Sequence, residues 1–246
     1  MGKFFPEGIR PSVSYYSNFF SALEIDSTYY SIPTRDSFQS SLKKIDRSLK
    51  ISVKLPSSVT HFGLPEQRKE SMKLFVENVA DPLFHRDSGS LMLFTIPPWI
   101  GKSNMEKYLH EMKEVTMEAG HIYAELRNFS EDLFEMTRNI LEKLDFGISF
   151  TDNYLNHLRL METGERIVYI RLHGRNPNFS RPDTGMNKFN YLYSKLELET
   201  IGKEIRRMEK QFESVYIFFN NHPNGNAPVN AMELGRILGQ SKMGFL

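Results

Sequence analysis

Apolar runs that become polar only at their C-terminal ends recur along this chain, and they constrain its fold more than any other feature. Two clear examples are Val168–Gly174 and Val215–His222, which are rich in β-branched and aromatic residues. In the first run Arg171 and His173 are two residues apart, so in a strand they point to the same face. Apolar strands with polar C-terminal ends are how a (β/α) barrel places an active site.

Seven such runs alternate with segments of helical pattern, and no linker-like or low-complexity stretch separates them. The expected strands are 22–30, 50–56, 90–98, 121–127, 146–152, 168–174 and 215–222. The expected helices cover about 12–22, 34–47, 66–80, 103–118, 130–144, 194–213 and 228–239, with capping-box spacing at Ser103–Glu106 and Ser194–Glu197. Strict alternation of this kind predicts a parallel sheet with right-handed crossovers.

A barrel and a doubly wound open sheet both fit this alternation. The polar ends are spread over nearly all of the strands, whereas an open sheet would gather them at one switch point. A length of 246 residues also suits one TIM barrel. We therefore expect a single α/β, TIM-type (β/α) barrel domain over residues 1–246. The long irregular segment 175–193 is a candidate lid or binding loop.

Composition narrows the classes of partner and the compartment. Thirty-one basic and 30 acidic residues give a net charge of +1, which disfavours nucleic acid and anionic membranes as partners. The chain has no cysteine, so disulfides, thiolate metal sites and cysteine nucleophiles are excluded. The Met1 end lacks a signal-peptide pattern, and no apolar run reaches membrane length. We expect a cytoplasmic protein.

The candidate site consists of the charged and polar residues at the strand ends. These are Glu24, Asp26, Lys54, Glu125, Arg127, Asp152, Arg171, His173, Asn220 and Asn221, joined by His61 just after a strand. Parallel strands are covered on both faces, and a buried unpaired charge costs several kcal/mol, so these groups must pair with one another or line a wet cavity. Structural ion pairs across the barrel top and a ligand pocket are both open at this point.

Residue chemistry suggests roles within this set. Glu125 with Glu24 or Asp26 would form the carboxylate pair of acid–base chemistry, as in glycoside hydrolysis, and His173 would transfer protons near neutral pH. The predicted ligand-binding residues are Lys54, Arg127 and Arg171, which suit a phosphate or carboxylate, together with His61, Asp152, Asn220 and Asn221.

A metal site is a weaker alternative. His61, His173 and His222 fall at or just after strand ends near acidic residues, and nitrogen and oxygen ligands suit Zn, Mn or Mg. No local His spacing supports such a site, so no metal ligand is assigned. No dinucleotide fingerprint or nucleophile elbow is present, and the residues indicate no cofactor or oligomeric state. Lys203, Arg206, Arg207 and Lys210 are expected to form a solvated helix face.

The order of several short motifs resembles that of the YecE-like family, domain of unknown function seventy-two. The motifs are Leu23–Tyr30 with Pro33, Val53–Pro56 with Thr60-His61, Ala124–Arg127, Thr151-Asp152, Tyr169–Arg175, Tyr216–Asn221 and Asn230-Ala231. The resemblance runs from about residue 4 to residue 235. It implies a TIM-type barrel with a polar pocket at the C-terminal ends of the strands, and it implies no particular reaction.

Members of this family usually begin with a strand that ends in a Gly-Thr-Ser-Gly-like turn, followed by Phe-Tyr-Pro. This chain starts at Phe4-Phe5-Pro6, so we expect seven visible strands with the first strand of the family barrel absent. The leading hypothesis is an enzyme acting on a small polar, phosphorylated or carbohydrate-like ligand. The alternatives are a divalent-metal-dependent phosphoesterase or isomerase, and a non-catalytic ligand- or partner-binding module.

Overall fold

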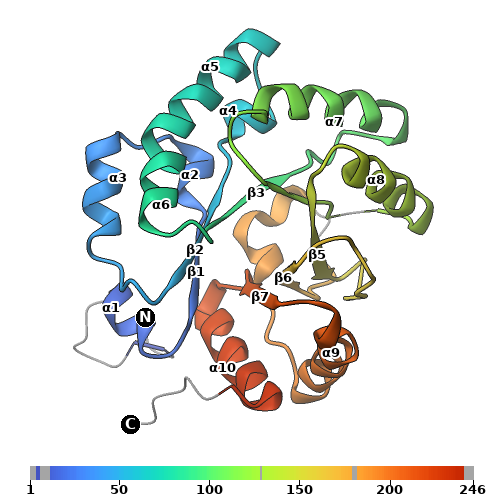
Figure 1. Ribbon diagram of the computed structural model, residues 1–246. Coiled ribbons are helices and arrows are strands. Elements are labelled where there is room, and N and C mark those ends of the chain that lie inside the picture. Colours follow the sequence, from blue (N-terminus) through green and yellow to red (C-terminus); the bar gives the residue numbers. More distant parts are fainter. Residues whose placement is uncertain (1–3, 6–11, 128, 179–181, 241–246) are drawn as a thin grey trace. The chain divides into compact units, whose positions relative to one another are not determined.

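The computed structural model of the protein describes residues 4–5, 12–127, 129–178 and 182–240 (Figure 1). Pro6, in the motif where the family resemblance begins, lies outside these ranges. The chain forms two compact units, and each is described by itself. One consists of Ser21–Ile148, and the other of Met1–Phe20 with Ser149–Leu246.

The unit Ser21–Ile148 contains four parallel strands within the described residues. They are β1 (Ala22–Ile25), β2 (Lys50–Lys54), β3 (Leu91–Thr95) and β4 (Tyr123–Glu125), and each pairs with the next along the chain. All five residues of β3 are buried, as expected for a parallel strand that is covered on both faces.

Helices follow each of these strands, and Figure 1 shows α3, α5 and α6 together on one side of β1 and β2. Their bounds are α2 (Ser27–Tyr30), α3 (Arg35–Leu42), α4 (Ser57–Thr60), α5 (Pro65–Phe75), a π-helical turn (Val76–Ala80), α6 (Asp81–Arg86), α7 (Lys102–Thr116) and α8 (Glu131–Lys143). In α7, Met105, Leu109 and Met112 recur every three to four residues and are buried, which is the stripe that packs a helix on a sheet.

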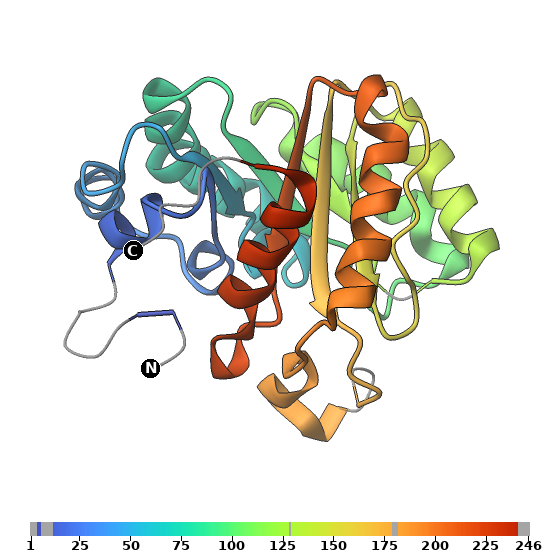
Figure 2. The same ribbon diagram turned by 90° about the horizontal axis from the view of Figure 1, so that it is seen from below.

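The second unit contains β6 (Ile167–Gly174), β7 (Ser214–Phe219) and most of β5 (Gly147–Asn153), again parallel and paired in chain order. Its helices are α1 (Val13–Ser17), α9 (Lys195–Met208) and α10 (Asn226–Leu238), with short 3-10 turns at Glu209–Gln211 and Pro223–Gly225. Figure 2 shows β6 and β7 beside α9 and α10.

The capping box expected at Ser194 is confirmed. Its hydroxyl accepts a hydrogen bond from the Glu197 backbone N–H, and the Glu197 carboxylate accepts one from the Ser194 backbone N–H. The capping box expected at Ser103 is wrong, because α7 begins two residues earlier, with Gly101 as its N-cap. Ser103 therefore lies inside the first turn of that helix.

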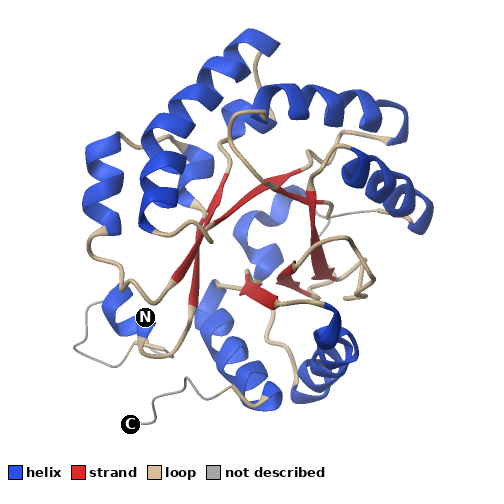
Figure 3. Ribbon diagram, in the orientation of Figure 1, coloured by secondary structure: helices blue, strands red, loops and turns tan. Residues whose placement is uncertain are grey.

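Two other expectations need correction. The strand expected over 22–30 ends at Ile25, and Ser27–Tyr30 instead form one helical turn, so Asp26 is not a strand residue. Alternation of strand and helix is also not strict. All of residues 154–166, between β5 and β6, are described, and they contain no helix (Figure 3).

Segment 175–193 is less irregular than expected, since Pro182–Phe189 forms a 3-10 helix with a kink at Gly185. Figure 2 places this helix beyond the C-terminal end of β6. The segment leaves β6 at Gly174, where φ is +87° and a Cβ atom would lie 2.7 Å from the Cβ of Tyr191. Only glycine fits this turn, because any other side chain would meet both strain and a clash.

Parallel strands in chain order with interposed helices define the fold class as α/β, of the TIM-type (β/α) barrel, as expected. Among the described residues, none of the helices combines the length and the hydropathy needed to cross a lipid bilayer.

Candidate functional site

The last residues of three neighbouring strands form the centre of the candidate site in unit Ser21–Ile148. They are Lys54 of β2, Thr95 of β3 and Glu125 of β4, and all three are buried. The Thr95 hydroxyl donates a 2.7 Å hydrogen bond to Glu125 Oε2. Arg127 Nε donates to the same oxygen at 2.8 Å. Arg127 lies two residues beyond the end of β4 and forms an ion pair with Glu125.

Two single-turn helices bring aromatic rings to these strand ends. Lys54 Nζ lies 4.3 Å from the centre of the Tyr29 ring, close enough for a cation–π interaction. The Tyr29 ring meets the His61 ring edge to face at 5.3 Å. The hydroxyl of Thr28 donates to the Lys54 carbonyl at 2.7 Å, which ties helix α2 to the end of β2. Burial raises the pKa of Tyr29, so its hydroxyl stays protonated.

His61 is neutral at physiological pH. Burial, followed by the positive charges of Lys54 and Arg127, lowers the pKa of His61 to about 4. The Thr60 hydroxyl lies 2.7 Å from His61 Nδ1 and donates to the Pro56 carbonyl at 3.3 Å. The Thr60–His61 contact fits either ring tautomer, because the hydroxyl can donate to Nδ1 or accept from an Nδ1–H.

Exposed aromatic side chains adjoin His61. The Trp99 ring lies 5.3 Å from the His61 ring, and the Phe62 ring lies 6.2 Å from Trp99. Trp99 is 57% exposed and Phe62 is 63% exposed. We call Phe62 and Trp99 the aromatic edge. Two adjacent exposed rings form a small apolar surface that a ligand or a partner can cover.

In the second unit, Asp152 is fully buried and holds several elements together. Its carboxylate accepts hydrogen bonds from Arg175 Nε at 3.0 Å and Arg175 Nη2 at 2.7 Å, a bidentate pair. It also accepts from the Tyr193 hydroxyl at 2.8 Å and from the Leu158 backbone N–H at 2.8 Å. The same hydroxyl accepts from the Gly174 backbone N–H at 2.8 Å. Burial, with Asp152 adjacent, raises the pKa of Tyr193 well above its usual value.

Asn221 and Asn230 organise the end of the 175–193 segment. Asn230 accepts from the Tyr193 backbone N–H and donates to the Tyr193 carbonyl, both at 3.0 Å. Asn221 Nδ2 donates to the Tyr191 carbonyl and to Asn230 Oδ1, both at 2.8 Å. These contacts join residues 191–193 to Asn221, just after β7, and to Asn230 of α10.

Arg171 and His173 are both fully buried on β6. Asn220 Nδ2 lies 3.5 Å from His173 Nδ1. The Phe189 ring lies 5.9 Å from the His173 ring and 5.9 Å from the His222 ring. The 3-10 helix that carries Phe189 therefore contacts the ends of both β6 and β7.

Of the two acidic residues expected in the first strand, only Glu24 lies in it. Glu24 is half-buried in β1, in register with Ser52 of β2. Asp26 lies just beyond the strand as the N-cap of α2, and its side chain does not cap that helix. Within the described ranges, no three His, Asp or Glu side chains are gathered closely enough to hold a metal ion. The metal-dependent alternative therefore gains no support from these residues.

Sequence reasoning missed Tyr29, Thr95, Tyr193 and Asn230. The strand expected over 22–30 would put the Tyr29 side chain on the face opposite Glu24 and Asp26. Tyr193 and Asn230 are far apart along the chain, so neither position signals their contact. The sequence does carry a signal for Thr95, because it is a polar residue near the C-terminal end of the otherwise apolar run 90–98.

Comparisons with known proteins agree on one family. The family model described as "Protein of unknown function DUF72" matches residues 1–245. The UPF0759 protein YunF of Bacillus subtilis is 26% identical to the chain, over 91% of this chain and 85% of that protein.

Solved structures of the same family share the fold. A DUF72 family protein of Thermotoga maritima is 27% identical, with a TM-score of 0.80 over 98% of this chain and 94% of that one. Another, from Enterococcus faecalis, is 21% identical, with a TM-score of 0.81 over 94% of this chain and 90% of that one. The match over the whole chain confirms the resemblance noted from its motifs: the chain belongs to the DUF72 family, whose members in these two organisms have the same fold.

Proposed function

We propose that the protein is an enzyme that binds a small phosphate- or carboxylate-bearing ligand at the C-terminal ends of β2–β4 and moves a proton at that ligand through His61. The observation that carries the proposal is the positive environment of His61. Lys54 and Arg127 both lower the pKa of its ring. A site that keeps a histidine neutral between two cations is suited to an anion.

Lys54 and Arg127 would bind the anion. Buried Glu125 holds Arg127 through Nε, and 23% of the Arg127 side chain is exposed. A guanidinium whose orientation is set in this way recognises two oxygens of a phosphate or carboxylate at once. Lys54 adds a charge whose position is set by the Tyr29 ring.

His61 would transfer the proton. A general base must be unprotonated at the working pH and must present a lone pair. His61 is neutral, and in the tautomer that we propose Nδ1–H donates to the Thr60 hydroxyl and Nε2 presents the lone pair. A bound anion would counter the charges of Lys54 and Arg127 and so raise the pKa of His61 towards neutrality. Base strength would then increase only when the ligand is present.

Glu125 was the acid–base residue suggested by the sequence, but its contacts favour another role. Its Oε2 accepts hydrogen bonds from both Thr95 and Arg127, which stabilises the ionised form. We propose that Glu125 positions Arg127. Contacts to the ligand by Glu24, Arg171, His173 and Asn220 remain predictions from the sequence.

The aromatic edge supports a ring-bearing ligand. Sugars bind to exposed aromatic faces through their apolar C–H surfaces, and Trp99 and Phe62 lie next to His61. A sugar phosphate combines such a ring with an anion, so it is the probe that fits the site best.

A thermal-shift titration with glucose 6-phosphate tests the anion site, with unphosphorylated glucose as the matched ligand control. At about a hundred times its Kd a ligand adds about 2.7 kcal/mol, which is roughly 5–10 °C in Tm for a chain of this size. Lys54→Met should abolish the shift. Lys50→Met should keep it, because Lys50 begins the same strand and pairs with Asp87 there. Equal shifts in wild type and Lys54→Met would refute the site.

The proton-transfer role is read in the same samples by NMR of the His61 ring. We expect a pKa of about 4 in the free protein and a higher pKa with glucose 6-phosphate bound. A pKa of His61 near 6.5 in the free protein, or no change in that pKa on binding, would contradict its role as a base. The protein would then be an anion-binding module, which is the non-catalytic alternative.

A further inference from the structure

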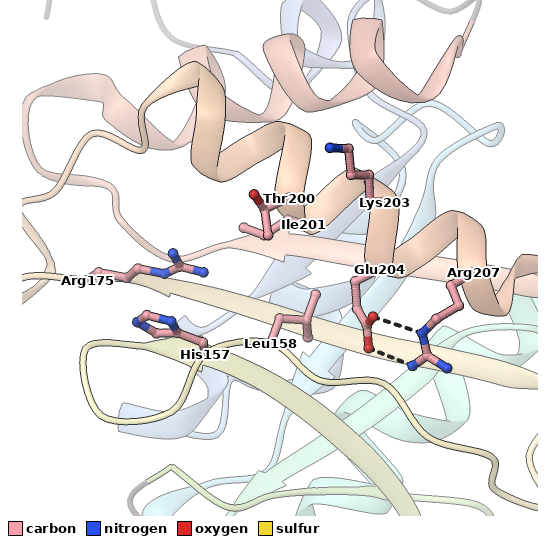
Figure 4. A pocket seen from close by; sticks show the side chains of 8 residues that line it. All are labelled: His157, Leu158, Arg175, Thr200, Ile201, Lys203, Glu204 and Arg207. Atoms are coloured by element: carbon pink, nitrogen blue, oxygen red, sulfur yellow. Dashed lines mark hydrogen bonds and ion pairs between the residues drawn. The ribbon is translucent and has the colours of Figure 1, made fainter.

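A cavity lies beside helix α9, in the unit that contains Ser149–Leu246. Its volume is about 340 Å³, at the lower end of the range for ligand pockets. It is lined by α9 on one side, by Arg175 just after β6, and by part of the connection between β5 and β6. Figure 4 shows its side chains from close by.

The cavity exists because the β5–β6 connection contains no helix. In a regular β/α unit a helix would pack against its neighbour on the sheet, and here residues 154–166 run as an irregular segment beside α9. The segment is held at two points. The Leu158 N–H donates to Asp152, and Leu160 exchanges hydrogen bonds with Glu204 and Arg207 of α9. These hydrogen bonds hold the segment against Asp152 and α9 in the absence of a ligand.

The lining has an apolar middle and charged ends. Figure 4 shows the side chains of Leu158 and Ile201 between Arg175 with His157 at one end and the Glu204–Arg207 pair at the other. This is the usual composition of a small-molecule site, in which apolar groups supply contact area and a few polar groups fix orientation.

The charges of α9 favour an anion. Lys203 and Arg207 were expected to form a solvated helix face; both are exposed, and both line the cavity. They are four residues apart, so they are neighbours on the helix surface. Within the described residues, Lys203 has no acidic partner. Arg207 uses Nε and Nη2 for Glu204 and Leu160, which leaves Nη1 available in that part of the chain.

The Glu204 carboxylate already has hydrogen-bond donors within the protein. It accepts two hydrogen bonds from Arg207 and one from the Leu160 N–H. Arg175, at the other end, is held by Asp152 and does not need a further partner. Lys203 and Arg207 Nη1 are thus the groups that a ligand would satisfy.

We propose that this cavity binds a small phosphate monoester with a compact apolar body. The phosphate oxygens accept hydrogen bonds from Lys203 Nζ and Arg207 Nη1, and the body packs on Leu158 and Ile201. This site shares no lining residue with the one proposed at β2–β4 and does not depend on it.

Phenyl phosphate is the test probe, titrated into the ¹⁵N-labelled full chain and followed by backbone amide shifts and calorimetry. We expect the shifts at residues 158–160 and 200–207. Lys203→Met should weaken binding about tenfold, the loss of one charge-assisted hydrogen bond. Lys195→Met is the matched control, because Lys195 is exposed on the same helix but does not line the cavity.

The mapping separates this proposal from the first one. Shifts confined to the ends of β2–β4, or an equal loss of affinity in both lysine variants, would overturn the cavity site whatever happens at His61. Unchanged affinity in Lys203→Met would overturn it too. Binding of phenol as tight as that of phenyl phosphate would show an apolar pocket and refute the role of the phosphate.

Discussion

At the scale of single residues, the buried hydroxyl of Tyr193 shows how one atom can connect several parts of the chain. It donates to Asp152 and accepts from the Gly174 N–H, at the point where the chain leaves β6. Burial raises the pKa of Tyr193, so it keeps this donor over the whole physiological range. Because Asp152 is also fully buried, each bond that it accepts offsets part of the cost of its burial.

Replacing Tyr193 with Phe should destabilise the protein by about 1–3 kcal/mol, because it leaves the buried Gly174 N–H without an acceptor. The measurement is urea unfolding, with a lower midpoint at unchanged slope. Tyr30→Phe is the control: Tyr30 is 77% exposed, so a change within about 0.5 kcal/mol is expected. Equal midpoints for the two variants would contradict the network.

At the scale of elements, the backbone conformation of one residue, the N-cap, decides where a helix begins. Ser194 caps α9 with both bonds of a capping box, whereas α7 starts at Gly101 and leaves Ser103 inside its first turn. The two serines have the same sequence spacing to a glutamate, so the pattern alone cannot distinguish them. The difference is which residue adopts the extended backbone of an N-cap.

Ser194→Ala should cost about 1 kcal/mol, since it removes the acceptor for the Glu197 N–H. Ser103→Ala should change stability by less than about 0.5 kcal/mol, and towards higher stability, because Ala is the better helix former. Chemical unfolding of the pair checks both values. A loss at Ser103 as large as the loss at Ser194 would mean that α7 starts at Ser103 after all.

At the scale of the whole molecule, the shifted pKa values act together on stability. The pKa of folded His61 is about 4 against 6.5 when unfolded, so its contribution is complete above pH 6.5 and is lost as the pH falls towards 4. Hydrogen bonds to Asp87, Glu197 and Glu204 lower the pKa of each carboxyl, so stability from these groups is lost as the pH falls below about 4.5.

Tyrosines with raised pKa values limit the stability of the fold at alkaline pH. Burial raises the pKa of Tyr108 and Tyr193, and burial with the nearby Glu197 raises that of Tyr191 to about 12. Their folded pKa values exceed the unfolded value of 10, so their contribution is complete below pH 10 and is lost above it.

We therefore expect Tm to be nearly constant from roughly pH 7 to pH 10 and to fall on both sides. Thermal unfolding across pH, for wild type and His61→Gln, is the measurement. The variant should lack the decline between pH 6.5 and 4.5 and keep the steeper one below it. A variant profile that parallels wild type through that interval would show that His61 is not buried as a neutral ring.

The pattern of apolar runs was sufficient to predict the fold class, because periodicity and polar strand ends are local properties of the chain. Val168–Gly174 and Leu91–Thr95 were recognisable as buried parallel strands from composition alone. The motifs were sufficient for the family. Glu125 and Arg127 are two residues apart in the sequence and do form an ion pair, although β4 ends at Glu125 and not at Arg127 as expected.

Tertiary structure decided what those residues contact. β1 stops at Ile25, and the Tyr29 ring then contacts Lys54 and His61. Thr28 holds this turn by donating to the Lys54 carbonyl, a partner from another strand. The linkage of Asp152, Arg175 and Tyr193, and the cavity beside α9, likewise arise from chain segments that are distant in sequence. Hydrogen bonds, burial and pKa shifts act between such segments, and no local pattern encodes them.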